Sequence, residues 1–194
     1  NVAPEIELIA LSLSSIVEGQ AVMVSGTFSD LALGTSSETF TGSALWSDGV
    51  NTSLTIVGGT FSTTRSFPDD NPTGTLSDTF TVAITLNDDD LGSDTETSTT
   101  LTVNNVAPEL DSLSATSVDE TGTVHLTGTY HDAGILDTHV LRVDWGEGMP
   151  ELFVVSGGTF DIPHQYLDDN PSGTPSDTYT IGVTLTDDDT GSDT

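Results

Sequence analysis

Apolar and polar residues alternate along much of this chain with a period of two, in short runs bounded by Gly, Asn, Asp and Pro. The clearest run, 79–87, has apolar side chains at every second position: Phe80, Val82, Ile84 and Leu86. Such alternation is typical of a strand with one buried face and one wet face. In the first half of the chain it predicts strands near residues 5–14, 21–29, 38–47, 50–57, 60–66, 79–87 and 95–103. We therefore expect an all-β protein.

The second half of the chain repeats the first. Residues 69–95, DDNPTGTLSDTFTVAITLNDDDLGSDT, return ninety-nine positions later as DDNPSGTPSDTYTIGVTLTDDDTGSDT, and both halves open with Asn-Val-Ala-Pro-Glu. A repeat of this length in a chain of 194 residues predicts two domains of one fold, 1–104 and 105–194. Seven short strands in the first domain favour an immunoglobulin-like β-sandwich, with Trp46 and Trp145 as core anchors.

The second copy is one strand shorter than the first. The first continues after GSDT through ETSTTLTVN to its last strand, whereas the second reaches only Ser192-Asp193-Thr194. We expect a slot with unpaired backbone groups beside the sixth strand of the second domain. Either the natural chain continues past Thr194, or another molecule fills the slot.

The charge balance excludes several classes of partner. The chain has 31 acidic residues, two arginines, no lysine and no cysteine, which gives a formal charge of −29. A phosphate backbone needs cationic side chains, so nucleic acid is excluded. No apolar run approaches the roughly 20 residues of a membrane-spanning helix, so membrane insertion is not expected. Self-repulsion at this charge favours a folded form that binds cations or lives in salt.

The segments VDWGEG (143–148), HQY (164–166) and DTYTIGVTLTDDD resemble the polycystic-kidney-disease (PKD) repeat, whose pattern is close to W-x-F-G-D-G followed by H-x-Y. That family is an immunoglobulin-like sandwich of extracellular proteins. The first copy departs from the pattern, because ALWSDG and Arg65-Ser66-Phe67 stand at the equivalent places. The segments NVAPE, DDNPSGTPSDTYT and TDDDTGSDT are similar to those of tandem arrays in long bacterial surface or secreted proteins. The resemblance implies a structural or adhesive role at the cell surface, and no catalysis.

The acidic residues fall on the loops that immunoglobulin order brings to the two ends of each domain. Carboxylates with an Asn-bearing linker offer the oxygens that Ca²⁺ binds, and the arrangement is similar in topology to the calcium junctions of cadherins. The ligands expected at the junction are Glu18, Asp69, Asp70, Asn104, Asn105, Asp132, Asp187, Asp188 and Asp189. Translation by one repeat adds Asp30, Asp88, Asp89, Asp90 and Asp94, which would face a preceding repeat. The alternative is that these residues form turns on a solvated acidic surface.

These features favour a calcium-rigidified spacer whose partners are neighbouring repeats of the same or an identical chain. The alternative is a filament subunit that receives a strand from its neighbour in the open slot. A carbohydrate-binding module would need exposed aromatic residues, but both tryptophans occupy strand positions that predict burial. No nucleophile, phosphate loop or shared catalytic histidine recurs in both copies, so we do not expect an enzyme.

Overall fold

A computed structural model describes residues 2–34, 38–168 and 172–194. Its regular elements in those ranges are all strands, which confirms the all-β prediction. The chain divides into two compact units: unit 1 comprises residues 1–73 and 77–104, and unit 2 comprises 74–76 and 105–194. In the described part of the chain, no helix has the length and apolar character needed to cross a membrane.

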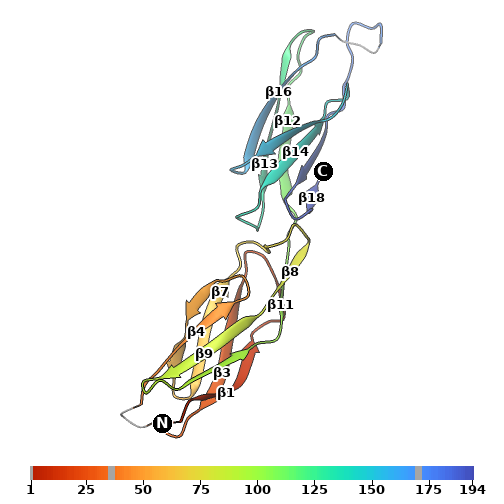
Figure 1. The fold of residues 1–194 in the computed structure, drawn as a ribbon. Coiled ribbons are helices and arrows are strands. Elements are labelled where there is room, and N and C mark those ends of the chain that lie inside the picture. Colours follow the sequence, from red (N-terminus) through yellow and green to blue (C-terminus); the bar gives the residue numbers. More distant parts are fainter. Residues whose placement is uncertain (1, 35–37, 169–171) are drawn as a thin grey trace. The chain divides into compact units, whose positions relative to one another are not determined.

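Unit 1 is a β-sandwich, and Figure 1 labels several of its strands and colours them in sequence order. One sheet has the order β1-β3-β7-β6, a second has β10-β9-β4-β5, and a smaller one has β2-β11-β8. The bounds are β1 (Glu5–Leu11), β2 (Ser15–Val17), β3 (Ala21–Ser29), β4 (Phe40–Trp46), β5 (Asn51–Ser53), β6 (Thr55–Val57), β7 (Thr60–Ser66), β8 (Ser77–Phe80), β9 (Val82–Asp88), β10 (Ser93–Thr97) and β11 (Leu101–Asn104).

Three of the seven predicted strands of unit 1, at 50–57, 79–87 and 95–103, each divide into two strands that lie in different sheets. The run 79–87 is an example, because β8 pairs with β11 whereas β9 pairs with β4 and β10. The break falls at Thr81, whose N–H donates to Ser47 Oγ at 3.2 Å and whose carbonyl accepts the Ser47 N–H at 2.9 Å. An extended chain keeps its alternation when it changes sheet, so the sequence pattern could not reveal these breaks.

The inward faces of the sheets form one apolar core in unit 1. Trp46 is 1% exposed and packs edge-on against Phe67, with ring centroids 5.3 Å apart. Phe67 in turn packs against Phe80 at 4.9 Å. The prediction that Trp46 anchors the core is therefore confirmed.

Unit 2 repeats this plan with two sheets, β12-β13-β16 and β15-β14-β17-β18. Trp145 is 1% exposed and anchors its core as predicted. The bounds are β12 (Glu109–Ala115), β13 (Thr123–His131), β14 (His139–Asp144), β15 (Glu151–Val155), β16 (Thr159–Gln165), β17 (Gly182–Thr186) and β18 (Ser192–Asp193).

The last part of unit 2 differs from the equivalent part of unit 1. β18 is a two-residue strand on β17, one more than the six strands expected. Residues 176–181, the counterparts of β8 and the start of β9, do not lie in a strand. In unit 1 the equivalent segment, β8, is paired with β11.

Candidate metal site

Three loops of unit 1 meet at the place where the chain leaves the unit. β2 ends at Val17, and the next residue, Glu18, donates its N–H to the carbonyl of Asn104 at 3.0 Å. The loop after β2 is also tied to Phe67, whose N–H donates to Gln20 O at 2.9 Å. Phe67 lies just before Asp69 and Asp70 in the chain, so these backbone bonds bring the acidic loop after β7 towards Glu18.

Glu18, Asp69 and Asp70, which we call the unit 1 triad, form a buried acidic cluster. Their exposed fractions are 1%, 6% and 0%, and each contributes a carboxylate oxygen to a group whose members lie within 4.8 Å of one another. Asp69 accepts two hydrogen bonds from Asn71, at 2.8 Å from its backbone N–H and 2.9 Å from its Nδ2. The structure thus brings together three of the predicted metal ligands.

The three buried carboxylates of the unit 1 triad need a nearby positive charge to offset their mutual repulsion. Burying like charges side by side is costly unless a cation or protons compensate them. The chain has two arginines, of which Arg65 binds Asp48 and Arg142 is exposed on β14. Oxygens bound to Ca²⁺ at 2.3–2.6 Å lie up to about 4.6–5.2 Å apart across the ion. The spread of the triad therefore fits the shell of one calcium ion.

Asn104, predicted as a linker ligand, is used within unit 1. Its Nδ2 donates to Ser15 Oγ at 2.9 Å and to the Ile16 carbonyl at 2.7 Å. These bonds tie the end of β11 to β2 and hold the adjoining loop that carries Glu18.

The acidic residues predicted at the other loops of unit 1 mostly accept backbone N–H groups. Asp88 Oδ1 accepts from Asp90 at 3.0 Å and from Gly92 at 2.6 Å. The other predicted ligands accept as follows: Asp89 Oδ1 from Thr39 at 3.3 Å, Asp30 Oδ1 from Ala32 at 2.7 Å, and Asp94 Oδ2 from Ile6 at 2.8 Å. The bond from Ile6 places Asp94 between β10 and β1, where it links two strands.

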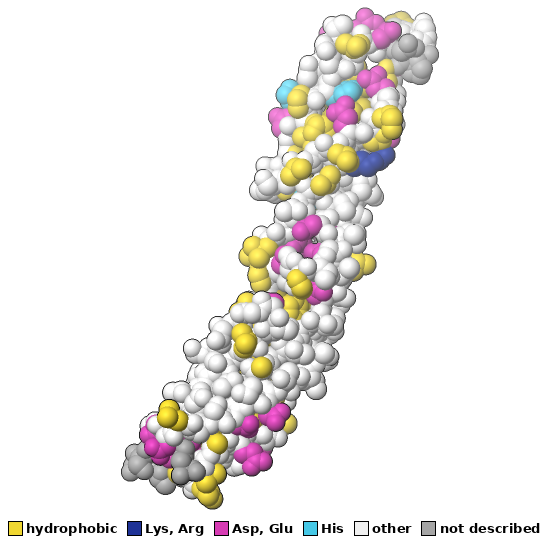
Figure 2. All heavy atoms as spheres, in the orientation of Figure 1, with side chains coloured by type: hydrophobic (Ala, Val, Ile, Leu, Met, Phe, Trp, Pro, Cys, Tyr) yellow, Lys and Arg dark blue, Asp and Glu magenta, His cyan; other side chains and the backbone are white. Residues whose placement is uncertain are grey.

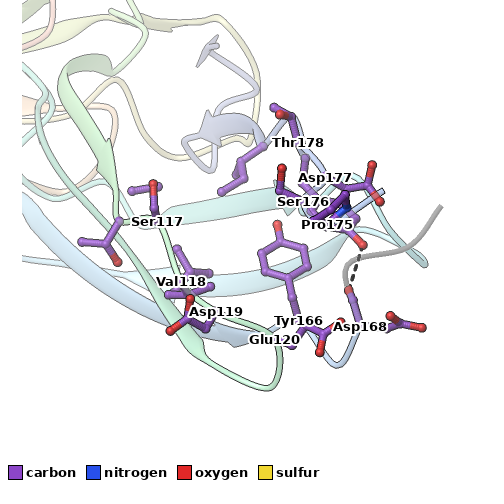
Figure 3. A pocket seen from close by; sticks show the side chains of 15 residues that line it. Ser117, Val118, Asp119, Glu120, Tyr166, Asp168, Pro175, Ser176, Asp177 and Thr178 are labelled. Atoms are coloured by element: carbon purple, nitrogen blue, oxygen red, sulfur yellow. Dashed lines mark hydrogen bonds between the residues drawn. The ribbon is translucent and has the colours of Figure 1, made fainter. Parts of the chain in front are cut away.

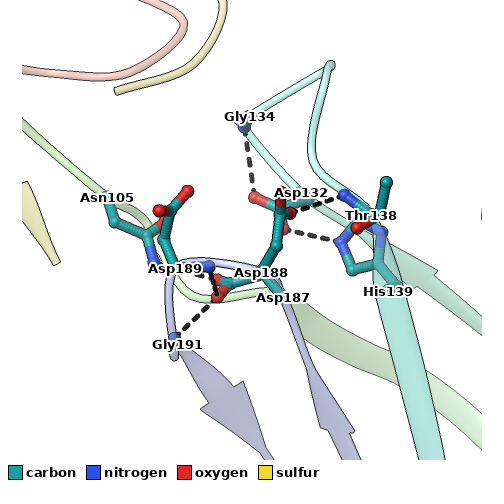
Figure 4. Close-up of polar contacts among 9 residues, drawn as sticks. All are labelled: Asn105, Asp132, Gly134, Thr138, His139, Asp187, Asp188, Asp189 and Gly191. Carbon is teal, nitrogen blue, oxygen red and sulfur yellow. Dashed lines mark hydrogen bonds and ion pairs between the residues drawn. The ribbon is translucent and has the colours of Figure 1, made fainter. Parts of the chain in front are cut away.

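Unit 2 reproduces this pattern at the loops shown in Figure 4. Asp187 Oδ1 accepts from the N–H groups of Asp189 at 3.0 Å and Gly191 at 2.7 Å, and Asp188 Oδ1 accepts from Thr138 at 2.7 Å. Asn105 joins the same group, because its Nδ2 donates to Asp187 Oδ2 at 2.9 Å. The repeated bonds are those of a turn-forming aspartate, and they give Asp88 and Asp187 a structural role that needs no ion.

The loop that carries Asp132 in unit 2 has a histidine neighbour that unit 1 lacks. Its Oδ1 accepts the Gly134 N–H at 3.1 Å, and its Oδ2 lies 2.8 Å from His139 Nε2, with both side chains of that pair nearly buried. In unit 1 the place of His139 is taken by Phe40, which packs on Phe28 with ring centroids 4.9 Å apart. The sequence alone does not pair His139 with Asp132, because only the fold of the loop brings these residues, seven positions apart, together.

Glu38 is a further member of the acidic loops that sequence reasoning missed. Partial burial, then the neighbouring Asp89 carboxylate and the charges of Asp30 and Asp88, raise the pKa of Glu38 above its ordinary value. The sequence gives no signal for this role, because Glu38 falls in the predicted strand 38–47, whereas β4 starts at Phe40. Figure 2 shows acidic side chains gathered in groups, with broad stretches of neutral surface elsewhere on the face in view.

Comparisons with known proteins do not assign this chain to a family. No family model and no curated protein sequence matches it. The PKD resemblance therefore stays a prediction.

Solved structures with some likeness include a DUF4785 family protein from Legionella pneumophila (10% identity, TM-score 0.37, covering 94% of this chain and 52% of that one). A second is the FN1–FN3 domains of chicken CNTN1 (8% identity, TM-score 0.32, covering 98% of this chain and 65% of that one). A third is the adhesin InvE of Yersinia pseudotuberculosis (12% identity, TM-score 0.40, covering 97% of this chain and 58% of that one). This chain spans less than two thirds of each. At these scores the likenesses assign no ligand or activity to it.

Proposed function

We propose that this chain is a structural module of a tandem extracellular array, and that Ca²⁺ held by the unit 1 triad stabilises it as a spacer. The observation that carries the proposal is the burial of Glu18, Asp69 and Asp70 in one cluster with the spread of a calcium shell. The duplicated sequence supports a tandem array of domains, because the same pattern of strands and acidic loops occurs in both halves of the chain.

Bound Ca²⁺ would supply the positive charge that three buried carboxylates require. Because Glu18 is hydrogen bonded to Asn104, the triad adjoins the residue at which the chain leaves unit 1. An ion there stabilises the loops from which the linker 104–108 starts, and so restricts that end of the linker. Acidic sites of extracellular modules bind Ca²⁺ with dissociation constants of about 10⁻⁴–10⁻³ M, which suits millimolar calcium outside cells. An exposed structural or adhesive array at the cell surface fits these properties.

The test compares Glu18→Gln with the matched control Glu7→Gln, which changes an exposed glutamate of β1 in the same unit. For the unchanged chain, 10 mM Ca²⁺ against a dissociation constant near 1 mM adds about 1.4 kcal/mol of stability. That corresponds to a rise of roughly 6–11 °C in the melting temperature of unit 1. Calorimetry in EDTA and in Ca²⁺ measures this shift for all three proteins.

The two variants should respond in different ways. Glu18→Gln should melt at or above the unchanged chain in EDTA, because it removes one of three repelling charges, and should lose most of the calcium shift. Glu7→Gln should keep the full shift. If Ca²⁺ raised the melting temperature of all three proteins equally, or of none, the calcium role of the triad would be wrong.

A further inference from the structure

The outer face of strands β14 and β15 in unit 2 carries exposed apolar side chains. Val140 of β14 lies directly opposite Val154 of β15, and Arg142 lies opposite Leu152. Residues directly opposite each other in an antiparallel pair point to the same face of the sheet. The exposed fractions are 38% for Val140, 69% for Leu152 and 85% for Val154. These three apolar side chains and Arg142 therefore form one surface, which we call the outer patch.

The duplication gives an internal comparison for the outer patch. Its four residues lie ninety-nine positions after residues of unit 1 that all bear a hydroxyl group: Thr41, Ser43, Ser53 and Thr55. Both units keep a buried tryptophan and a Gly-Gly-Thr-Phe segment at the same offset. The sandwich therefore does not require apolar residues or a cation on this face. Their presence in unit 2 alone points to a contact that unit 2 makes and unit 1 does not.

Two opposite charges lie next to each other on the same face. Arg142 and Asp144 are two positions apart on β14, so their side chains point to the same side of the sheet. Asp144 accepts the N–H of Gly146 at 3.1 Å. Among the residues that the structure describes, Arg142 forms no ion pair, although the chain has 31 acidic residues. The charge of this arginine is therefore available to a partner.

The order of these charges fits a second copy of the same surface. A two-fold axis that crosses β14 between Arg142 and Asp144 brings each arginine opposite the aspartate of the other copy, and symmetry forms the contact twice. The same axis brings Val140 and Val154 towards the loop 146–150 of the other copy, where Met149 is 85% exposed. The contact thus combines two ion pairs with apolar surface from both copies.

We propose that the outer patch pairs two copies of this chain face to face about a two-fold axis. Arg142 of each copy binds Asp144 of the other, and the apolar side chains of the patch shield the two ion pairs from water. The dimer is weak, because the contact is centred on a few side chains. The proposal is independent of the calcium site, because the outer patch lies in unit 2 and shares no residue with the unit 1 triad.

Sedimentation equilibrium of the 194-residue chain in EDTA measures the pairing without calcium. In 0.15 M NaCl the repulsion between two copies of charge −29 extends over a Debye length of only about 8 Å. The unchanged chain should form a dimer, and no larger species, at concentrations up to about 1 mM.

Exchanging the two charges tests the contact directly. Arg142→Asp and Asp144→Arg should each weaken the dimer at least about tenfold, because each change places like charges opposite one another. The two changes combined in one chain should restore the dimer, since the exchanged charges are again complementary. An equal mixture of the two single variants should form a mixed dimer for the same reason.

The residues of unit 1 supply a second test. Val140→Thr, Leu152→Ser and Val154→Thr combined should weaken the dimer at least about tenfold. The melting temperature of unit 2 should stay within a few degrees, because these side chains are exposed. The control is Val118→Thr, which changes a valine of similar exposure, 37%, in the separate hollow of about 820 Å³ shown in Figure 3. It should leave the dimer unchanged.

Each other outcome contradicts a part of the proposal. A chain that stays monomeric up to about 1 mM would overturn the pairing. A dimer that none of the outer-patch variants weakened would use another surface, and the outer patch would be wrong. Growth into larger species would exclude the two-fold arrangement. A mixture of Arg142→Asp and Asp144→Arg that stayed monomeric would contradict the contact between these two residues.

Discussion

The residue that covers the buried tryptophan differs between the two units, although its role is the same. In unit 1 the Arg65 guanidinium lies 5.0 Å from the Trp46 ring and 4.2 Å from the Phe67 ring, and it forms a two-point ion pair with Asp48. In unit 2 the His164 ring stacks on Trp145 with centroids 4.3 Å apart. His164 Nε2 lies 3.0 Å from Glu147, which stands at the place of Asp48. Each unit therefore covers its tryptophan with a basic residue held by an acid.

The Arg65–Asp48 pair makes the stability of unit 1 depend on acid pH. Burial opposes ionisation of Asp48, but the hydrogen bonds from Arg65 outweigh it and lower the pKa of that carboxyl. A lowered pKa adds stability above the unfolded value of about 3.9, and that stability is lost as pH falls through the folded pKa. Asp48→Asn should therefore cost about 1 kcal/mol at pH 7 and flatten the loss of stability below pH 4.

Urea unfolding at several pH values, followed through NMR signals of unit 1, measures the effect of Asp48→Asn. Glu96→Gln, at an exposed position of β10, is the control and should follow the unchanged chain. An Asp48→Asn protein that lost stability in acid as steeply as the unchanged chain would contradict this role of the ion pair.

At the residue scale the sequence located the acidic loops but could not assign their roles. Glu18 is buried, and its N–H donates to the carbonyl of Asn104, a residue far along the chain that no local pattern relates to it. Asp88 and Asp187, in contrast, hold their own loops through local N–H groups. The two kinds of acid look alike in the sequence, because what separates them is which backbone groups the fold brings near them.

At the scale of elements, both units share a distortion opposite a glycine. The pairing of β1 with β3 shifts register between Ile6 and Leu8, near Gly26, and β12 with β13 shifts between Leu110 and Ser112, near Gly128. A methyl group on Gly26 would lie 2.1 Å from the Leu8 carbonyl oxygen and 2.2 Å from the Phe61 ring. The bulge and the aromatic ring thus occupy the space that any other residue would need.

Replacing either of these glycines should destabilise its own unit. Gly26→Ala and Gly128→Ala force the facing strand or the ring to move, so each should cost about 1–3 kcal/mol or more. Gly173→Ala, at a position with open space around the added methyl group, should change stability by less than about 0.5 kcal/mol. Urea unfolding of the three variants measures the costs. Equal small effects at all three glycines would contradict the close packing.

The alternation of apolar residues was sufficient to locate most of the strands but not their partners. β3 and β7 match the predicted bounds, since each stays in one sheet along its whole length. The run 50–57 instead divides into β5 and β6 where Leu54 donates its N–H to the Gly42 carbonyl at 3.1 Å. The change of partner depends on the facing sheet, so the residues of the run alone could not predict it.

At the scale of the whole molecule, a formal charge of −29 acts on every part of the chain. Repulsion among exposed carboxylates acts over a Debye length of about 30 Å at 0.01 M salt and only about 8 Å at 0.15 M. Raising NaCl between these limits in EDTA should therefore raise the melting temperatures of both units. This general screening needs no site, and it is the response expected of an acidic, solvated surface.

Adding Ca²⁺ at constant ionic strength separates a specific site from screening. At a total ionic strength of 0.15 M, replacing part of the NaCl with CaCl₂ leaves the Debye length near 8 Å, so a further rise for unit 1 reports binding. We expect that rise in the unchanged chain and in Glu7→Gln, and its loss in Glu18→Gln, whose carboxylate is the buried one. Calorimetry at fixed ionic strength measures it. If CaCl₂ and NaCl gave the same melting temperatures, the repeated acids would act only as diffuse charge, and the spacer would owe its stability to salt.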